Sequence, residues 1–232
     1  MKGAALLAAA AVGGAAWAVR GRSSAVFGPS VWRGTGDRKS VALTFDDGPG
    51  PATIEILNIL NNLNVMATFF ECGINVRRHP QIAREVLLAG HEIGNHSDTH
   101  PNLALRGLAF IADEFRRGQT AIEEATGITP TLLRAPFGVR WFGFREMQAS
   151  LGLQGVMWSL IGLDWKLSAP AIAHRILSRV RHGDIICLHD GRGIAECPDV
   201  SPTIEAVRKI IPALLEKGYH FETVPQLLCP SK

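Results

Sequence analysis

From Ser40 onward, short apolar runs alternate with longer segments in which apolar residues recur at helical spacing. The short runs predict seven strands, at residues 41–45, 67–72, 91–95, 131–135, 155–160, 184–188 and 219–223. The longer segments predict six helices, at residues 52–63, 80–89, 104–125, 142–151, 170–181 and 203–217. Four glycines lie between a helix and the next strand, where a left-handed residue ends the helix: Gly90, Gly152, Gly183 and Gly218.

This alternation predicts an α/β fold with parallel strands and right-handed crossovers. About seven strands with outer helices in so short a chain favour closure into a (β/α) barrel, and an open doubly wound sheet is the alternative. No glycine-rich phosphate loop follows a predicted strand, which argues against nucleotide binding. In such folds the catalytic groups collect at the carboxyl ends of the strands.

The N-terminus has a different character from the rest of the chain. Between Lys2 and Arg20 lie 17 uncharged residues, mostly Ala, Leu and Gly, which predict a signal peptide or membrane anchor over residues 1–22. The Ala16-Trp17-Ala18 triplet suits cleavage, and the run is at the low end for a span of about 20 residues. The sequence is compatible with cleavage of this segment and with its retention. We expect a linker at 23–39 and an extracytoplasmic protein: secreted, periplasmic, or associated with a membrane through its N-terminus.

Composition and charge exclude several classes of protein. The chain has 232 residues, 47% of them hydrophobic and 19% charged, which is typical of a globular protein. Its formal net charge is +3 and its basic residues are scattered, so we expect no nucleic-acid partner. The four cysteines fit no zinc ribbon or disulfide framework. Cys72 and Cys187 lie in predicted strands and should be buried, whereas Cys197 and Cys229 lie in loop-like sequence and could pair after export. The oligomeric state is not predicted.

Two pairs of residues at strand ends point to a metal. The first strand ends in Asp46-Asp47-Gly48-Pro49, and two adjacent carboxylates repel each other unless a cation offsets their charge. His96 and His100 follow the third strand at a spacing of four, which places both imidazoles on one side of a helical turn. A pair of capping and turn aspartates, and a loop cluster of histidines, are the structural alternatives. Taken together, the Asp pair and the His pair predict a metal site with one Asp and two His ligands. Such a site leaves coordination positions open, which is the pattern of a catalytic metal.

Three further groups stand at strand ends. Arg134 precedes Ala135-Pro136-Phe137-Gly138 at the end of the fourth strand. Asp164-Trp165 follows the fifth strand, and His189 leaves the apolar sixth strand directly. All of these should meet at one rim of the barrel.

With these motifs in order, the chain resembles the polysaccharide deacetylases with a NodB homology domain, carbohydrate esterase family 4. The resemblance covers about residues 40–228, which would form one catalytic domain. Thr44–Pro49 and His96–His100 match the first two motifs, Arg134–Gly138 is similar to the third, and Asp164-Trp165 and His189 match the fourth and fifth in part.

The resemblance implies a distorted (β/α) barrel that holds a divalent metal at Asp47, His96 and His100. Zn²⁺ is the first expectation, with Co²⁺ or Ni²⁺ as alternatives. It also implies that Asp46 is the general base acting on a metal-activated water and that His189 is the general acid.

Other residues take supporting roles by the same resemblance. Arg134 would orient Asp46, and Asp164 would pair with His189. The substrate-binding residues would be Phe137, whose backbone N–H would face the oxyanion, with Gly138, Trp165 and Cys187. The implied activity is hydrolysis of N-acetyl groups on an N-acetylglucosamine-containing glycan, of the chitooligosaccharide or peptidoglycan type. Another acyl substrate, such as acetylxylan or a non-sugar amide, and a non-catalytic glycan-binding protein are the alternatives.

Two positions depart from the family pattern. Ile161 stands where an Asp is usual, three residues before Asp164. We expect the absence of that carboxylate to loosen Arg134 or its neighbours. Cys187 stands where a Leu is usual, in the pocket for the acetyl methyl group, which we expect to be reshaped.

Overall fold

The computed structural model describes residues 2–229, and only the backbone of residues 2–9. Within this range one sheet of nine strands is found, and every strand pair in it is parallel. The strands are β1 (Ser30–Val31), β2 (Ser40–Asp46), β3 (Thr68–Glu71), β4 (Glu92–Asn95), β5 (Leu132–Leu133), β6 (Gln154–Val156), β7 (Leu160–Ile161), β8 (Ile185–His189) and β9 (His220–Phe221).

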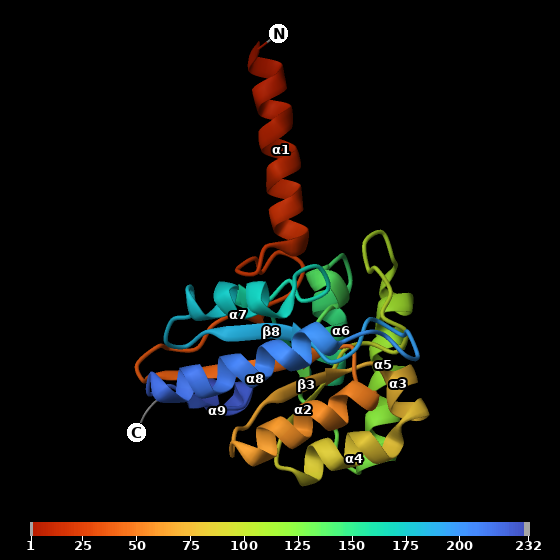
Figure 1. The fold of residues 1–232 in the computed structure, drawn as a ribbon. Helices are drawn as coiled ribbons and strands as arrows, with labels where there is room; N and C mark the ends of the chain where they lie inside the picture. The colour runs from red at the N-terminus through yellow and green to blue at the C-terminus, as the bar shows by residue number, and fades with distance from the viewer. Residues whose placement is uncertain (1, 230–232) are drawn as a thin grey trace.

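Most helices connect successive strands and lie outside the sheet (Figure 1). They are α1 (Lys2–Arg20), α2 (Pro51–Asn62), α3 (Gly73–Arg78), α4 (Pro80–Leu88), α5 (Leu108–Thr126), η1 (Pro136–Gly138), α6 (Phe144–Leu151), α7 (Ala169–Leu177), α8 (Ser201–Glu216) and α9 (Val224–Leu228). The predicted helices are present with small shifts at their ends. α3 and α9 were not predicted, because five or six residues are too few to show a helical period.

The strand order almost closes the sheet into a ring. Along the hydrogen-bonded path it is β1-β6-β5-β4-β3-β2-β8-β7, with β9 paired to β2. From β2 to β6, neighbours in sequence are neighbours in the sheet, and β8 and β7 continue on the other side of β2. Residues 157–159 alone join β6 to β7, a link that spans about 14 Å at most. The predicted distorted (β/α) barrel is therefore confirmed, and the open doubly wound sheet is not formed.

The predicted strand at 155–160 is in fact two strands on opposite sides of the opening in the barrel. The N–H of Met157 donates to the carbonyl of Val31 at 2.7 Å, whereas the N–H of Ser159 donates to that of Ile185 at 3.0 Å. The backbone thus changes partners within two residues. An apolar run in the sequence carries no sign of that exchange, because both halves are buried strands.

Both faces of the sheet are covered by apolar side chains. All seven residues of β2 are buried, as expected for a central parallel strand. On the helix side, Phe45 stacks on Phe69 with ring centroids 5.1 Å apart. Ala42 and Phe70 belong to a separate cluster that includes residues of α9. This packing fixes the strand ends that carry the polar residues.

Arg140 fastens the segment after α1 to the barrel. Its side chain is almost fully buried, and its guanidinium donates to the carbonyls of Ser24, at 2.6 Å, and Gly21. Its backbone N–H donates to the carbonyl of Val19 at 3.0 Å. β1, which lies within the predicted linker, then pairs with β6. The chain is therefore anchored on the barrel from Val19 onward, while α1 stands away from it (Figure 1).

The predicted N-terminal segment, residues 1–22, lies partly outside the described residues. Among those that are described, none of the helices combines the length and the apolar character that a membrane crossing requires.

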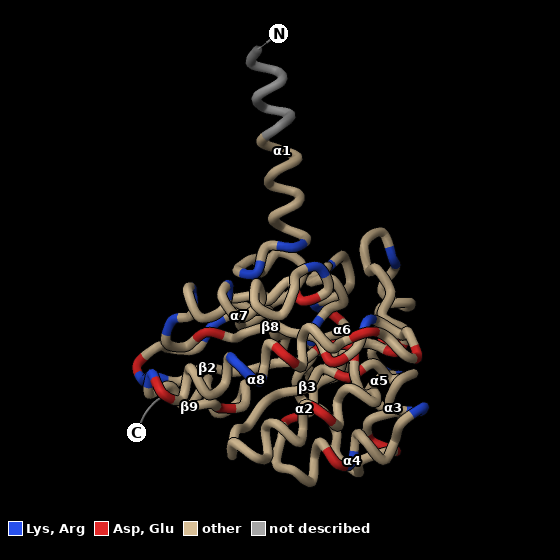
Figure 2. Tube along the Cα trace, in the orientation of Figure 1, with Lys and Arg blue, Asp and Glu red and all other residues tan. Residues whose placement is uncertain are grey.

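The structure shows how the charged residues and the cysteines are distributed. Lys and Arg are interspersed with Asp and Glu along the folded body, with no extended basic stripe in this view (Figure 2). Cys72 and Cys187 are buried, as predicted. Cys197 and Cys229 are exposed free thiols, so the pairing considered from the sequence is not present.

Arg140→Ala is expected to lower the free energy of unfolding by about 3 kcal/mol, because the buried carbonyl of Ser24 and the part-buried carbonyl of Gly21 lose a charged donor. It should also speed tryptic cleavage after Arg20 or Arg22, since their segment is no longer held. Urea denaturation and limited proteolysis measure both effects. The exposed ion-pair residue Arg116 provides the control, because Arg116→Ala should change stability by less than about 1 kcal/mol. Unchanged stability and proteolysis in Arg140→Ala would show that the segment is held by other contacts.

Candidate active site

Asp46 and Asp47 reach the same cavity because the chain turns between them. Adjacent side chains of a strand point to opposite faces. Asp46 is the last residue of β2, and Asp47 adopts a left-handed conformation with a φ of 78°. Aspartate tolerates this conformation better than most residues. Both carboxylates are buried and both line one cavity, as the sequence predicted.

His96 and His100 also converge, but not on a helical turn. The segment after β4 is a loop, in which Ser97 and His100 have φ values of 67° and 55°. The prediction of a helical turn is therefore wrong, since those values lie outside the right-handed helical region. The two imidazole centroids are nonetheless 5.0 Å apart.

Buried charges hold this loop in place. The carboxylate of Glu114, on α5, accepts hydrogen bonds from the backbone of Asp98 and from the backbone and hydroxyl of Thr99. The fully buried side chain of Asp98 pairs with Arg77, at 2.5 Å, and with Arg117. A buried carboxylate needs such partners to remain charged. The loop is thus fixed from α3 and α5, which keeps both histidines beside Asp47.

Asp47, His96 and His100 have the character of a metal site. Oδ1 of Asp47 is buried without a hydrogen-bond partner, yet Nε2 of His100 and Nε2 of His96 lie 3.1 and 3.4 Å away. Nδ1 of His96 lies 2.8 Å from the carbonyl of Arg134. A carbonyl only accepts, so Nδ1 carries the proton and Nε2 offers a lone pair. The three atoms lie within 4.8 Å of one another, and one carboxylate with two imidazoles suits a divalent ion such as zinc.

Arg134 lies inside the barrel and orients Asp46. Its guanidinium is fully buried and donates to Oδ1 of Asp46 at 2.6 Å and to the hydroxyl of Thr44 at 2.7 Å. It also donates to the carbonyls of Val156 and Met157, at 3.3 and 3.2 Å. These bonds leave Oδ2 of Asp46 without an Arg134 contact. The loosening of Arg134 expected from Ile161 is not seen, because the guanidinium has four acceptors.

Asp164 holds His189 by two bonds. Its Oδ1 lies 2.9 Å from Nδ1 of His189, and its Oδ2 accepts the backbone N–H of His189 at 2.8 Å. The hydroxyl of Thr203 donates to the same Oδ2 at 2.7 Å. Burial lowers the pKa of His189, but the hydrogen bond and charge of Asp164, helped by Asp47 and Asp46, outweigh it and raise this pKa to about 9. His189 is therefore a protonated imidazole near neutral pH.

The cavity has a volume of about 510 Å³ and collects most of the predicted residues. Asp46, the three candidate metal ligands, Phe137, Trp165, Cys187 and His189 line it. Phe137 and Trp165 are half exposed and form aromatic walls beside His100 and His189. Arg134 and Asp164 lie behind Asp46 and His189. Gly138 is buried and does not line the cavity; a Cβ there would contact Trp158 at 2.9 Å.

Sequence reasoning missed several lining residues. Trp158 lies in the link between β6 and β7, and Arg192 and Gly193 follow β8. Arg20 is brought to the cavity by the end of α1. Trp158 lies inside the run that the sequence predicts as one strand, so the pattern does not mark it as a residue of the rim. Nothing in the sequence indicates Arg20, which is far along the chain from the other lining residues.

Known proteins are similar to this chain in sequence. The family model described as Polysaccharide deacetylase matches residues 33–156. A chitooligosaccharide deacetylase of Bradyrhizobium sp. (strain ANU 289) is 36% identical over 210 residues, which cover 85% of this chain and 96% of the relative.

Solved structures give the same result. The Bc1960 peptidoglycan N-acetylglucosamine deacetylase superposes with a TM-score of 0.80 at 32% identity, over 87% of this chain and 93% of that one. BA3943 of Bacillus anthracis, a CE4 family pseudoenzyme, superposes with a TM-score of 0.79 at 28% identity, over 87% of this chain and 69% of that one. Similar folds thus occur in a deacetylase and in a pseudoenzyme, so the side chains of the site must decide activity. By sequence match and by structure, this chain belongs to the polysaccharide deacetylase family.

Proposed function

We propose that the protein is a metal-dependent hydrolase that removes N-acetyl groups from an N-acetylglucosamine-containing glycan. The observation that carries this proposal is the placement of a base and an acid in one cavity. The carboxylate of Asp46 is held by Arg134, the imidazole of His189 is held by Asp164, and both line the cavity beside the candidate metal ligands. A protein that only binds glycan needs neither group.

Asp47, His96 and His100 would hold the divalent ion, and zinc fits their ligand types best. When bound, it would lower the pKa of a water to about 7 and polarise the acetyl carbonyl. The neighbouring Asp46 is left for a different task, because Arg134 holds it at Oδ1 while Asp47 faces the two histidines.

Asp46 would act as the general base. Its Oδ2 would take the proton as the water oxygen attacks the carbonyl carbon. The buried guanidinium of Arg134 holds the carboxylate of Asp46 in one orientation, which a base needs before each turnover.

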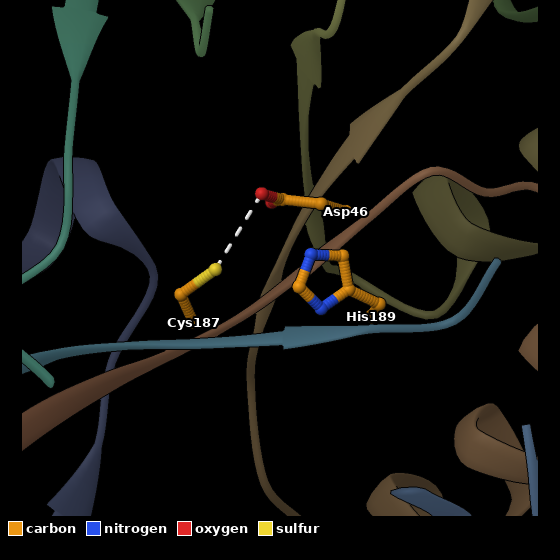
Figure 3. A group of neighbouring side chains, drawn as sticks. All are labelled: Asp46, Cys187 and His189. Carbon is orange, nitrogen blue, oxygen red and sulfur yellow. Dashed lines mark hydrogen bonds between the residues drawn. The ribbon is translucent and has the colours of Figure 1, made fainter. Parts of the chain in front are cut away.

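His189 would complete the reaction as the general acid. With Nδ1 engaged by Asp164, its Nε2 points toward Asp46 and the cavity (Figure 3). Nε2 would donate a proton to the amide nitrogen as the carbon–nitrogen bond breaks, which yields acetate and a free amine. Asp164 would stabilise the imidazolium before that transfer.

The walls of the cavity favour a sugar ring. Phe137 and Trp165 are exposed aromatic side chains that line the cavity beside His100 and His189, and such surfaces suit an amphipathic ring. Phe137 has a φ of 56°, and we propose that its backbone N–H helps to stabilise the oxyanion. The relatives that act on chitooligosaccharides and on peptidoglycan support this substrate class.

The zinc-loaded full chain is expected to release acetate from chitooligosaccharides or peptidoglycan. Asp46→Asn should lower kcat by about 100- to 10,000-fold, because it removes the base while keeping the shape of the side chain. Zinc analysis should still find one ion per chain in that variant, since Asp47, His96 and His100 are unchanged. Acetate release measured enzymatically, beside an exposed control such as His174→Ala on α7, provides the comparison.

Three other outcomes would redirect the proposal. Release from acetylxylan alone would make the protein an ester hydrolase. No release from any of these substrates by zinc-loaded protein would indicate a binding protein. Equal rates in Asp46→Asn and the wild type would show that Asp46 is not the base.

In the metal-free protein, Asp164→Asn should lower the pKa of His189 from about 9 toward or below about 6.5, the value of a free histidine. The stabilising effect of this contact should be complete below about pH 6.5 and be lost as pH rises through about 9, because the folded-state pKa is the raised one. NMR titration of the imidazole protons measures the change. Thr203→Val is the control, since it removes one hydrogen bond to Asp164 but leaves the charge. Similar pKa values for His189 in the wild type and Asp164→Asn would contradict the assignment.

A further inference from the structure

Cys187 belongs to a second group of potential metal ligands in the same cavity. The carboxylate of Asp46, the thiol of Cys187 and the imidazole of His189 lie with one ligand atom each within 4.8 Å of one another (Figure 3). All three line the cavity. This group shares no residue with Asp47, His96 and His100.

The sheet itself brings these three side chains together. Cys187 and His189 are two residues apart on β8, so their side chains point to the same face. Asp46 is the register partner of His189 on the adjacent strand β2. The arrangement therefore rests on rigid strands rather than on a loop.

Asp46 and His189, the two partners of Cys187, are each held at one side-chain atom by another residue. Arg134 holds Oδ1 of Asp46 at 2.6 Å, which leaves Oδ2 beside the thiol. Asp164 holds Nδ1 of His189 at 2.9 Å, which leaves Nε2 on the cavity side. A histidine whose far nitrogen contacts a carboxylate is a common feature of metal sites, because that contact orients the ring and raises its basicity.

The distance between sulfur and oxygen also suits a metal. Sγ of Cys187 lies 3.5 Å from Oδ2 of Asp46. For tetrahedral zinc, bonds of about 2.3 Å to sulfur and 2.0 Å to oxygen place those two atoms about 3.5 Å apart. These atoms therefore need little rearrangement to accept an ion.

We propose that Asp46, Cys187 and His189 form a second site, which binds a thiophilic cation such as Zn²⁺ when it is present in excess. The thiolate makes the site selective for soft and borderline cations over Mg²⁺ or Ca²⁺. Nε2 of His96 lies only 4.0 Å from Oδ2 of Asp46, so the two sites are contiguous and two bound cations repel each other. The guanidinium of Arg134, 2.6 Å from Asp46, also repels a cation at the second site, so this site fills after the first.

Filling this site also inhibits the enzyme, a consequence that rests on the proposed function. Asp46 and His189 become ligands and can no longer serve as base and acid. Two protons leave to solvent when the ion binds: that of the Cys187 thiol, which donates to Asp46 in the metal-free protein, and that on Nε2 of His189, whose Nδ1 stays with Asp164.

Cobalt titration of the metal-free full chain tests the site without reference to activity. Cys197→Ala and Cys229→Ala serve as the background, because those thiols are exposed. The first equivalent of Co²⁺ should bind without a thiolate-to-cobalt charge-transfer band, and the second should produce that band in the near ultraviolet. In the same background, Cys187→Leu and the closer-sized Cys187→Ser should bind one equivalent and show no band. If circular dichroism shows that Cys187→Leu is unfolded, the background protein is compared with Cys187→Ser alone.

A background protein that binds one equivalent and shows no band would overturn the proposal. So would a band that persists in Cys187→Ser. Excess zinc at about ten times the Kd of the second site should leave about one-tenth of the stoichiometric-zinc activity, and Cys187→Ser should lose much less of its own. A second equivalent with the band, in a protein that deacetylates nothing, would reject the proposed function and keep this site.

Discussion

The buried guanidinium of Arg134 is the constraint on which the rest of the site depends. A charge without access to water must be fully paired, and here the partners are Asp46, Thr44 and the carbonyls of Val156 and Met157. Those carbonyls lie where the chain passes from β6 to β7, at the opening of the barrel. The carbonyl of Arg134 itself accepts Nδ1 of His96. One residue thus orients the proposed base, fixes the tautomer of a candidate metal ligand and binds the backbone at the incomplete closure of the sheet.

This arrangement separates the tasks of two adjacent aspartates. Asp46 pairs with a permanent cation, whereas Asp47 faces two imidazoles that offer lone pairs to a metal. The left-handed conformation of Asp47 brings both carboxylates to one cavity, although adjacent side chains of a strand point to opposite faces. Cys187 adds chemistry that the leucine usual at this position cannot, because it places a thiol within reach of the same Asp46. In this chain the proposed base therefore borders one candidate cation site and belongs to another.

The sequence predicts what depends on periodicity and on strand ends. The buried strand β2 and the helix α2 follow from their apolar patterns, and the residues after β2, β4 and β8 share one rim because parallel strands end together. It does not predict what depends on backbone partners or distant contacts. The run around Met157 reads as one strand although its partners change there, and the loop of His96–His100 is fixed by Glu114 and Arg77 rather than by local propensity. Arg20 reaches the cavity through distant contacts of its segment, such as those of Arg140 with the carbonyls of Gly21 and Ser24.

The central claim is that Asp47, His96 and His100 hold a divalent cation beside Asp46. A crystal structure of the full chain loaded with one equivalent of zinc, with anomalous data collected at the zinc edge, tests it most directly. The account predicts one anomalous peak in the cavity, about 2.0–2.2 Å from an oxygen of Asp47 and from Nε2 of His96 and of His100. A peak held by other residues, or none in the cavity, would contradict it.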